Sequence, residues 1–101
     1  MGYYEDACRL AERLGMGIVP RDEPAECIAK TPKDLAQVIV DRMKLLEMDA
    51  SALSARSGVG IDSIERLART GKGTLDDVHS ALEALNLVPV CLPLPVNGWW
   101  E

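Results

Sequence analysis

Apolar residues recur every three to four positions in five segments of the chain, the spacing that gathers them on one face of an α-helix. Most of these segments are bounded by residues that favour helix ends, with Thr or Asp before the segment and Gly or Asn after it. The polar residues of each segment fall on the opposite face. The pattern therefore predicts five helices, at 3–14, 31–48, 50–57, 61–69 and 75–85.

The second predicted helix has the clearest start. The Thr31 hydroxyl can accept a backbone N–H of the first turn, and Pro32 has a φ angle that suits the first helical position. Asp34 adds negative charge where the helix dipole is positive. Thr74 can begin the last helix in the same way, and Asn86 is placed to stop it.

Two short helices adjoin one another between Asp49 and Lys72. Asp49 is a good N-cap, and Gly58 can take the left-handed conformation that ends a helix. Val59 is apolar and is expected to be buried between the two helices, and Gly71 closes the second. This order predicts a helix-turn-helix. The alternative that stays open is a helix pair in an all-α domain that binds no nucleic acid.

The segment 87–96 has the two-residue period of a strand, with apolar residues alternating with Pro and Cys. The prolines fall in one alternation class, so one edge of the strand lacks most of its N–H donors. We find no second convincing strand, and therefore predict pairing with a second copy across a two-fold axis. The alternative is a proline-rich tail on the helical body. The predicted dimer interface is Val88, Val90, Leu92 and Leu94.

The remaining segment, 15–30, contains Pro20 and Pro24 and is interpreted as a loop, with an extended Ile18–Val19 and a helical turn near 25–28. The fold class predicted is all-α. It is a compact helix-turn-helix bundle of four to five helices with an N-terminal helical extension and one C-terminal strand paired across a dimer. The predicted divisions are an extension at 1–30, a helix-turn-helix domain at 31–86, and a dimerisation strand and tail at 87–101.

Charge distribution changes this picture more than total charge does. The net charge of −5 opposes nucleic acid, but residues 50–73 carry four basic against two acidic side chains, a local excess of +2. Phosphate binding depends on nearby charges at physiological ionic strength, so the local excess supports a DNA contact. A solvated helix face would give the same alternation of signs.

The three cysteines, Cys8, Cys27 and Cys91, are odd in number and lack metal-ligand spacing. With one histidine they predict neither a disulfide framework nor a zinc site, and hence a reduced cytoplasmic protein without a cofactor. No apolar run is long enough for a membrane span. We expect no enzyme, because no candidate nucleophile has a base in view and no phosphate loop exists.

Two adjacent tryptophans, Trp99 and Trp100, stand near the end of the sequence. So small a core cannot easily bury both indoles. We expect at least one to pack on the body and interpret the pair as a candidate partner-binding site, because Trp is favoured at binding hot spots.

The stretches MDASALSARSGVGIDSIERL and GKGTLDDVHSALEALNL resemble the XRE (Cro/repressor-like) helix-turn-helix family. TPKDLA, the stretch ending in VPVCL and the Trp-bearing end look, more narrowly, like HipB-type antitoxins. The resemblance implies a recognition helix at Ile61–Arg69 and a kinase toxin as partner. Ala50 departs from the family pattern, in which a polar residue opens this helix. Asp62 and Glu65 also depart from it, because they put carboxylates on or near the face that would contact bases. The DNA-binding positions implied are Ser51, Arg56, Gly60, Ile61, Asp62, Ser63, Arg66, Arg69 and Lys72.

The function expected is a homodimeric, sequence-specific transcriptional repressor that binds double-stranded operator DNA, autoregulates its own gene and serves as the antitoxin of a toxin–antitoxin pair. In this reading Arg66 reads guanine through a bidentate contact, Ile61 touches a thymine methyl and Arg69 meets phosphate. The alternative is a helix-turn-helix module that binds a protein, as a phage-encoded inhibitor does. The acidic extension and the tryptophan pair favour that alternative.

Overall fold

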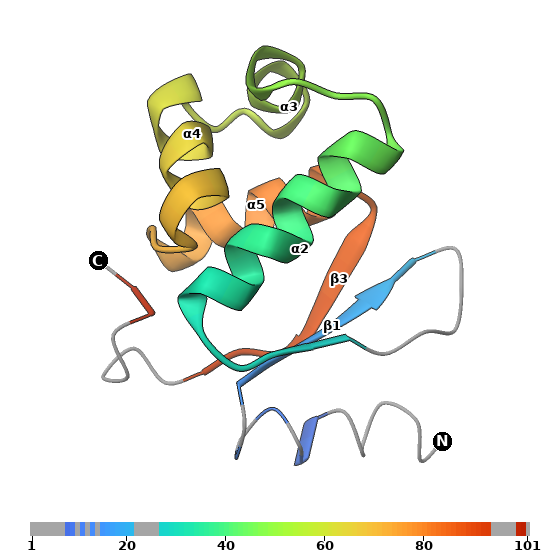
Figure 1. The fold of residues 1–101 in the computed structure, drawn as a ribbon, viewed down its shortest axis with the longest axis vertical. Helices are drawn as coiled ribbons and strands as arrows, with labels where there is room; N and C mark the ends of the chain where they lie inside the picture. Colours follow the sequence, from blue (N-terminus) through green and yellow to red (C-terminus); the bar gives the residue numbers. More distant parts are fainter. Residues whose placement is uncertain are drawn as a thin grey trace.

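The computed structural model describes residues 8, 9, 11, 13, 15–21, 27–93, 99 and 100. Among the described residues, four helices lie on one side of a small sheet, and the chain enters the helical part from one outer strand of the sheet and leaves it into the other (Figure 1). The elements are β1 Met16–Pro20, β2 Cys27–Ala29, α2 Pro32–Leu45, α3 Ala50–Ser57, α4 Ile61–Thr70, α5 Leu75–Ala84 and β3 Leu87–Cys91.

The four helices of the predicted 31–86 unit are present with bounds close to those expected. Thr31 caps α2 through a capping box: its hydroxyl accepts the Asp34 N–H at 3.2 Å, and the Asp34 carboxylate accepts the Thr31 N–H at 3.2 Å. Thr74 caps α5 through the Asp77 N–H. Asn86 follows the last turn with a positive φ of 63°, as its helix-stopping role predicts.

The all-α prediction was wrong, because the strands form a three-stranded antiparallel sheet in the order β2-β1-β3 and make the fold α+β. Ile18 pairs with Cys27 of β2 on one side and with Pro89 of β3 on the other. The register with β3 shifts between Gly17 and Ile18, since Gly17 pairs with Cys91. The segment interpreted as a loop is thus the middle of the sheet.

The dimer-strand prediction was also wrong, because β3 pairs with β1 of its own chain. Val88 and Val90 lie in this strand, half-buried, and Leu92 follows it. Leu94 falls outside the described residues. The edge position that the prolines predict is confirmed, since β3 closes one side of the sheet.

The N-terminal extension is tied to the sheet by a covalent bond. Cys8, Arg9, Ala11 and Arg13 are helical, as predicted, and the rest of segment 3–14 lies outside the described residues. Cys8 forms a disulfide with Cys91 of β3, their Cα atoms 5.0 Å apart. The prediction of no disulfide was wrong, because pairing depends on proximity in the fold and not on sequence spacing.

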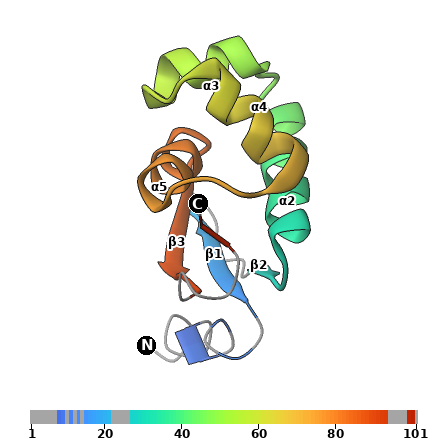
Figure 2. The same cartoon turned by 90° about the vertical axis from the view of Figure 1, so that its left-hand side faces the viewer.

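The core lies between the helices and the sheet. Met16 and Ile18 of β1 meet Leu35 and Ile39 of α2 in one cluster of fully buried side chains, to which the other helices contribute. The α3–α4 pair stands at one end of the molecule, and the helical residues before β1 lie at the opposite end (Figure 2). Helices α2 and α5 therefore lie between the sheet and the α3–α4 pair, since both contact that pair and each contacts a strand.

Candidate nucleic-acid interface

The turn between α3 and α4 is held by side chains as well as by glycine. Gly58 has a left-handed φ of 79°, and Val59 behind it is buried, as predicted. The Ser54 hydroxyl donates to the Val59 carbonyl at 2.6 Å, and the Val59 N–H donates to the Ser57 hydroxyl at 3.1 Å. Neither serine is predicted above to hold the turn; their position beside a turn glycine was the available signal.

The position of α4 is fixed from its inner face. Ile64 and Leu67 are fully buried in the core, and α4 packs on α2, α3 and α5. At its C-terminus Gly71 has a φ of 75°, and its N–H donates to the Leu67 carbonyl. The helix is therefore rigidly seated, and its outer face stands free of the other described elements.

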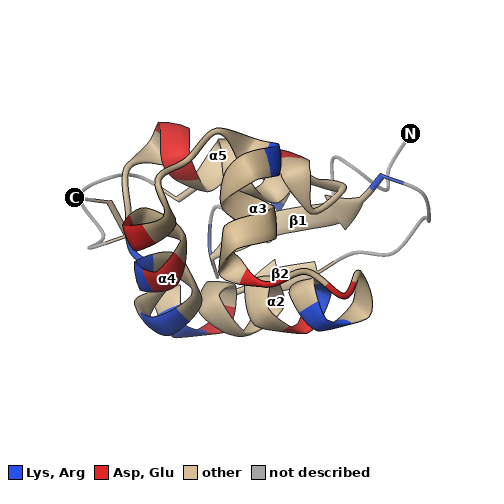
Figure 3. Ribbon diagram, turned by 90° about the horizontal axis from the view of Figure 1, so that it is seen from above, with Lys and Arg blue, Asp and Glu red and all other residues tan. Residues whose placement is uncertain are grey.

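The outer face of α4 carries both signs of charge, arranged along the helix. Asp62 and Glu65 are exposed in its N-terminal half, and Arg69 and Lys72 are exposed at and just beyond its C-terminal half. Figure 3 shows these acidic and basic positions on α4 beside the mixed charges of α2. This order of charges suits the helix dipole. The predicted basic recognition surface is therefore basic at one end only.

The structure exposes most of the residues predicted to bind DNA. Ile61 is 41% exposed at the start of α4, although it is a large apolar side chain. Arg66 and Ser63 are partly buried, and the Arg66 Nε atom is buried. A bidentate guanine contact by Arg66 would therefore use its terminal Nη groups and not Nε. The exposed predicted positions are Ser51, Arg56, Gly60, Ile61, Asp62, Arg69 and Lys72.

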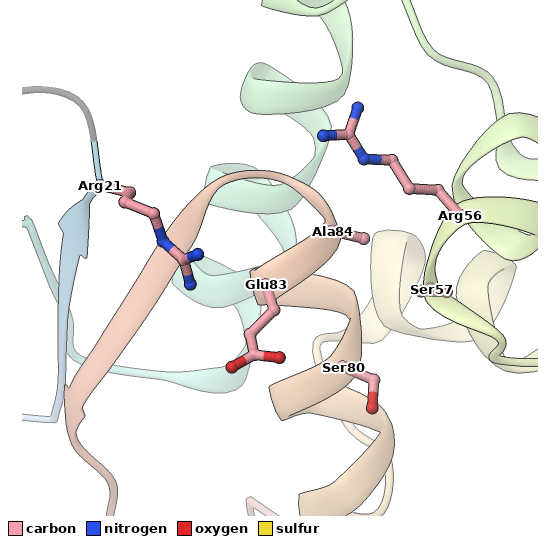
Figure 4. A pocket seen from close by; sticks show the side chains of 6 residues that line it. All are labelled: Arg21, Arg56, Ser57, Ser80, Glu83 and Ala84. Carbon is pink, nitrogen blue, oxygen red and sulfur yellow. The ribbon is translucent and has the colours of Figure 1, made fainter.

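Arg56 faces a depression beside α3 and away from the outer face of α4. Figure 4 shows its side chain on one wall and the Arg21 guanidinium directed toward Glu83 on the other, with Ala84 between them. The depression has a volume of about 330 Å³, and Ser57 and Ser80 complete its lining. Its charged groups are exposed and of both signs, so they favour no one ligand class strongly.

The two tryptophans fold back onto the domain. Trp99 is 4% exposed and belongs to the core, which agrees with the expectation that at least one tryptophan packs on the body. Trp100 is partly buried, its indole N–H donates to the Pro93 carbonyl at 3.2 Å, and its backbone bridges to Gly73. The tryptophans pack on the domain because burying the apolar surface of an indole contributes a large hydrophobic free energy.

A second depression, of about 250 Å³, is apolar and lies between α2 and the sheet. Val38 and Leu45 of α2 line it, and Leu45 is 68% exposed. Cys27, the free thiol among the described cysteines, also lines it, and burial, with a smaller contribution from the Asp34 carboxylate, raises the pKa of that thiol. A protonated thiol is a poor nucleophile, which fits an apolar contact surface better than a reactive site.

No protein-family model, curated protein or solved structure matches the chain. Among the described residues, no helix has the length and apolar character needed to cross a membrane.

Proposed function

We propose that the chain is a sequence-specific DNA-binding repressor that reads its operator with α4. One observation carries the proposal: the second helix of a helix-turn-helix is anchored by Ile64 and Leu67 and leaves Ile61, Asp62, Glu65 and Arg69 exposed to solvent. A rigid helix with a free outer face is what insertion into the major groove requires. Such a repressor would act in the cytoplasm, where it would bind DNA near its own gene.

The contacts divide by position along α4. Arg69 and Lys72 would meet phosphates, and the exposed Ile61 would touch a thymine methyl. Asp62 and Glu65 can accept from cytosine amino groups, and they repel phosphate wherever no such partner is present. The carboxylates therefore lower affinity for arbitrary DNA more than for the operator, which favours specificity over strong binding.

A two-fold operator implies a homodimer with half-sites about one helical turn apart. The β1-facing edge of β3 is already occupied, so the dimer surface would lie elsewhere. The role as antitoxin to a kinase toxin, which rests on the family resemblance, stays a prediction.

The test is binding to a DNA fragment from directly upstream of the gene, measured across a salt series by fluorescence anisotropy. We expect saturable, sequence-dependent binding whose affinity falls steeply with salt. Arg69→Ala and Lys72→Ala should each weaken binding several-fold and reduce the salt slope by about 1. Arg13→Ala removes an exposed cation at the opposite end of the molecule and serves as the matched control. Binding that ignores sequence, or equal effects of all three variants, would contradict the proposal.

A second candidate function, binding of a protein partner, is favoured by the apolar depression beside α2. Leu45 at its rim is 68% exposed, more than any other large apolar side chain among the described residues. An exposed apolar patch of this kind is common at protein interfaces. The same upstream-DNA experiment separates the two, since a protein-binding module need show no operator binding and need not respond to Arg69→Ala.

A further inference from the structure

The disulfide bonds the N-terminal helical residues to β3, at the point where β3 pairs with β1. Cys8 belongs to the N-terminal helical residues, and Cys91 is the last residue of β3, opposite Gly17 of β1. Both cysteines are partly exposed and neither belongs to the hydrophobic core, so the bond lies near the surface of the molecule. Disulfides in cytosolic proteins are usually transient and serve in redox sensing or catalysis, so this bond would have a regulatory role in a cytoplasmic repressor.

A short path of contacts leads from the disulfide to the end of α4. Two residues after Cys91, the Pro93 carbonyl accepts the Trp100 indole N–H. The Trp100 backbone bridges to Gly73 in the loop that follows α4, while Trp99 enters the core. Gly73 itself lies against α4, since a Cβ there would come within 3.0 Å of Leu67 Cδ2. Figure 1 and Figure 2 both place the C-terminal residues beside this loop.

We infer that the Cys8–Cys91 disulfide is a thiol–disulfide switch. It controls how firmly Trp99 and Trp100, here called the tail, hold the C-terminal end of α4. The inference rests on the proposed function, because α4 is taken to be the helix that reads DNA. The oxidised bond fixes the end of β3, from which the tail departs. Reduction releases Cys91 from the N-terminal residues, loosens the tail and leaves the loop around Gly73 less ordered.

The switching reaction is a two-electron exchange with a cellular dithiol. One thiolate of the dithiol attacks a sulfur of the Cys8–Cys91 bond, and the other cysteine leaves as a thiolate and takes up a proton. The second thiol of the reductant then displaces the first cysteine from the mixed disulfide. The chain gains two thiols and the reductant becomes a disulfide, so electrons and protons balance. A disulfide-containing oxidant reverses the exchange.

The oxidised form is the tighter DNA binder, because a helix already fixed in position loses less conformational entropy on binding. Loosening the loop after α4 acts first on Arg69 and Lys72, which lie on either side of Gly71 and are the proposed phosphate contacts. The redox state therefore changes the affinity for DNA through Arg69 and Lys72, the same two residues that are expected to contribute to the salt dependence of binding.

The first test is tryptophan fluorescence, because the sequence has two tryptophans and both lie in the tail. We expect dithiothreitol to shift the emission of the full chain to the red as Trp99 meets water, with the helical circular-dichroism signal at 222 nm unchanged. No shift on complete reduction would overturn the inference. Loss of the helical signal would also overturn it, since the bond would then support the whole fold and not a local switch.

The second test compares affinities for the upstream DNA fragment. Reduced protein should bind at least about fivefold more weakly than oxidised protein, a coupling at the low end of those usual for allosteric effects. Cys8→Ser should match reduced wild type and ignore dithiothreitol, whereas the matched control Cys27→Ser should keep the full response. Equal affinity of the two redox forms would overturn the switch. If neither form binds DNA, the proposed function fails, and the fluorescence alone decides whether the disulfide holds the tail.

Discussion

Gly71 lies where two helices come closest through their backbones. It ends α4 with a φ of 75°, and a Cβ built on it would lie 1.6 Å from the Pro32 carbonyl oxygen at the start of α2. No rotation of a side chain could relieve this overlap, because the backbone of residue 71 fixes where the Cβ lies and the carbonyl oxygen belongs to the backbone of Pro32. The contact at this position accordingly limits how closely α4 can approach α2.

We predict that Gly71→Ala lowers the free energy of unfolding by about 2–4 kcal/mol, because left-handed strain and a backbone clash add together. Gly58→Ala is the matched control: its φ of 79° is similar, but a Cβ there meets no atom within 4 Å. The control should cost only about 1 kcal/mol. Urea denaturation followed by circular dichroism measures both, and equal losses would contradict the role given to the Pro32 contact.

For single residues, the sequence predicted correctly that Gly58 and Gly71 end helices. It did not predict which other residues these glycines contact. Gly58 and Gly71 are where helix ends were expected, since left-handed conformations are cheap only for glycine. The approach of Gly71 to Pro32 could not be predicted, because it depends on how α2 and α4 pack. For the same reason the partial burial of Arg66 was missed.

The N-terminus of α2 is stabilised by hydrogen bonds of its capping residues. Thr31 and Asp34 exchange hydrogen bonds across the cap, and the Asp34 carboxylate also accepts the Lys30 N–H at 3.0 Å. Lys30 follows β2 directly, so the cap joins the sheet to the helical unit. We therefore expect loss of the cap to destabilise the junction between β2 and α2.

Thr31→Ala should destabilise the domain by about 1 kcal/mol, the usual cost of removing a side-chain N-cap. Ser51→Ala provides a control on α3, where the side chain is exposed and caps nothing; it should change stability by less than about 0.5 kcal/mol. Thermal denaturation distinguishes the two. A threonine variant as stable as the serine variant would show that the capping box contributes little.

The helices were predictable and two of the strands were not, for a physical reason. Helix ends and apolar spacing are local signals, and they located α2 to α5 within a few residues. In β1 the residues Met16–Val19 are buried on both faces, so no polar alternation marks the strand. In β2, Cys27–Ala29 is too short to show a period, and its pairing with β1 is visible only in the fold.

For the whole molecule, the disulfide closes a covalent loop between residues 83 positions apart. Such a link restricts the unfolded chain far more than the folded one. Reduction should therefore lower the free energy of unfolding by about 2–4 kcal/mol, seen as a lower urea midpoint in dithiothreitol. Cys27→Ser should show the same drop on reduction, and Cys91→Ser should show none. An unchanged midpoint for reduced wild type would contradict this stabilising role.

The position of β1 between β2 and β3 has a consequence for the order of assembly. β2 follows β1 closely, whereas β3 comes only after the whole helical unit. Contacts near in sequence form fast and distant ones late, so α2 to α5 are expected to gather before β3 reaches β1. Until then the middle strand presents one open edge, which is a template for pairing with another nascent chain. A chain interrupted before Leu87 would lack β3 and would carry that open edge permanently.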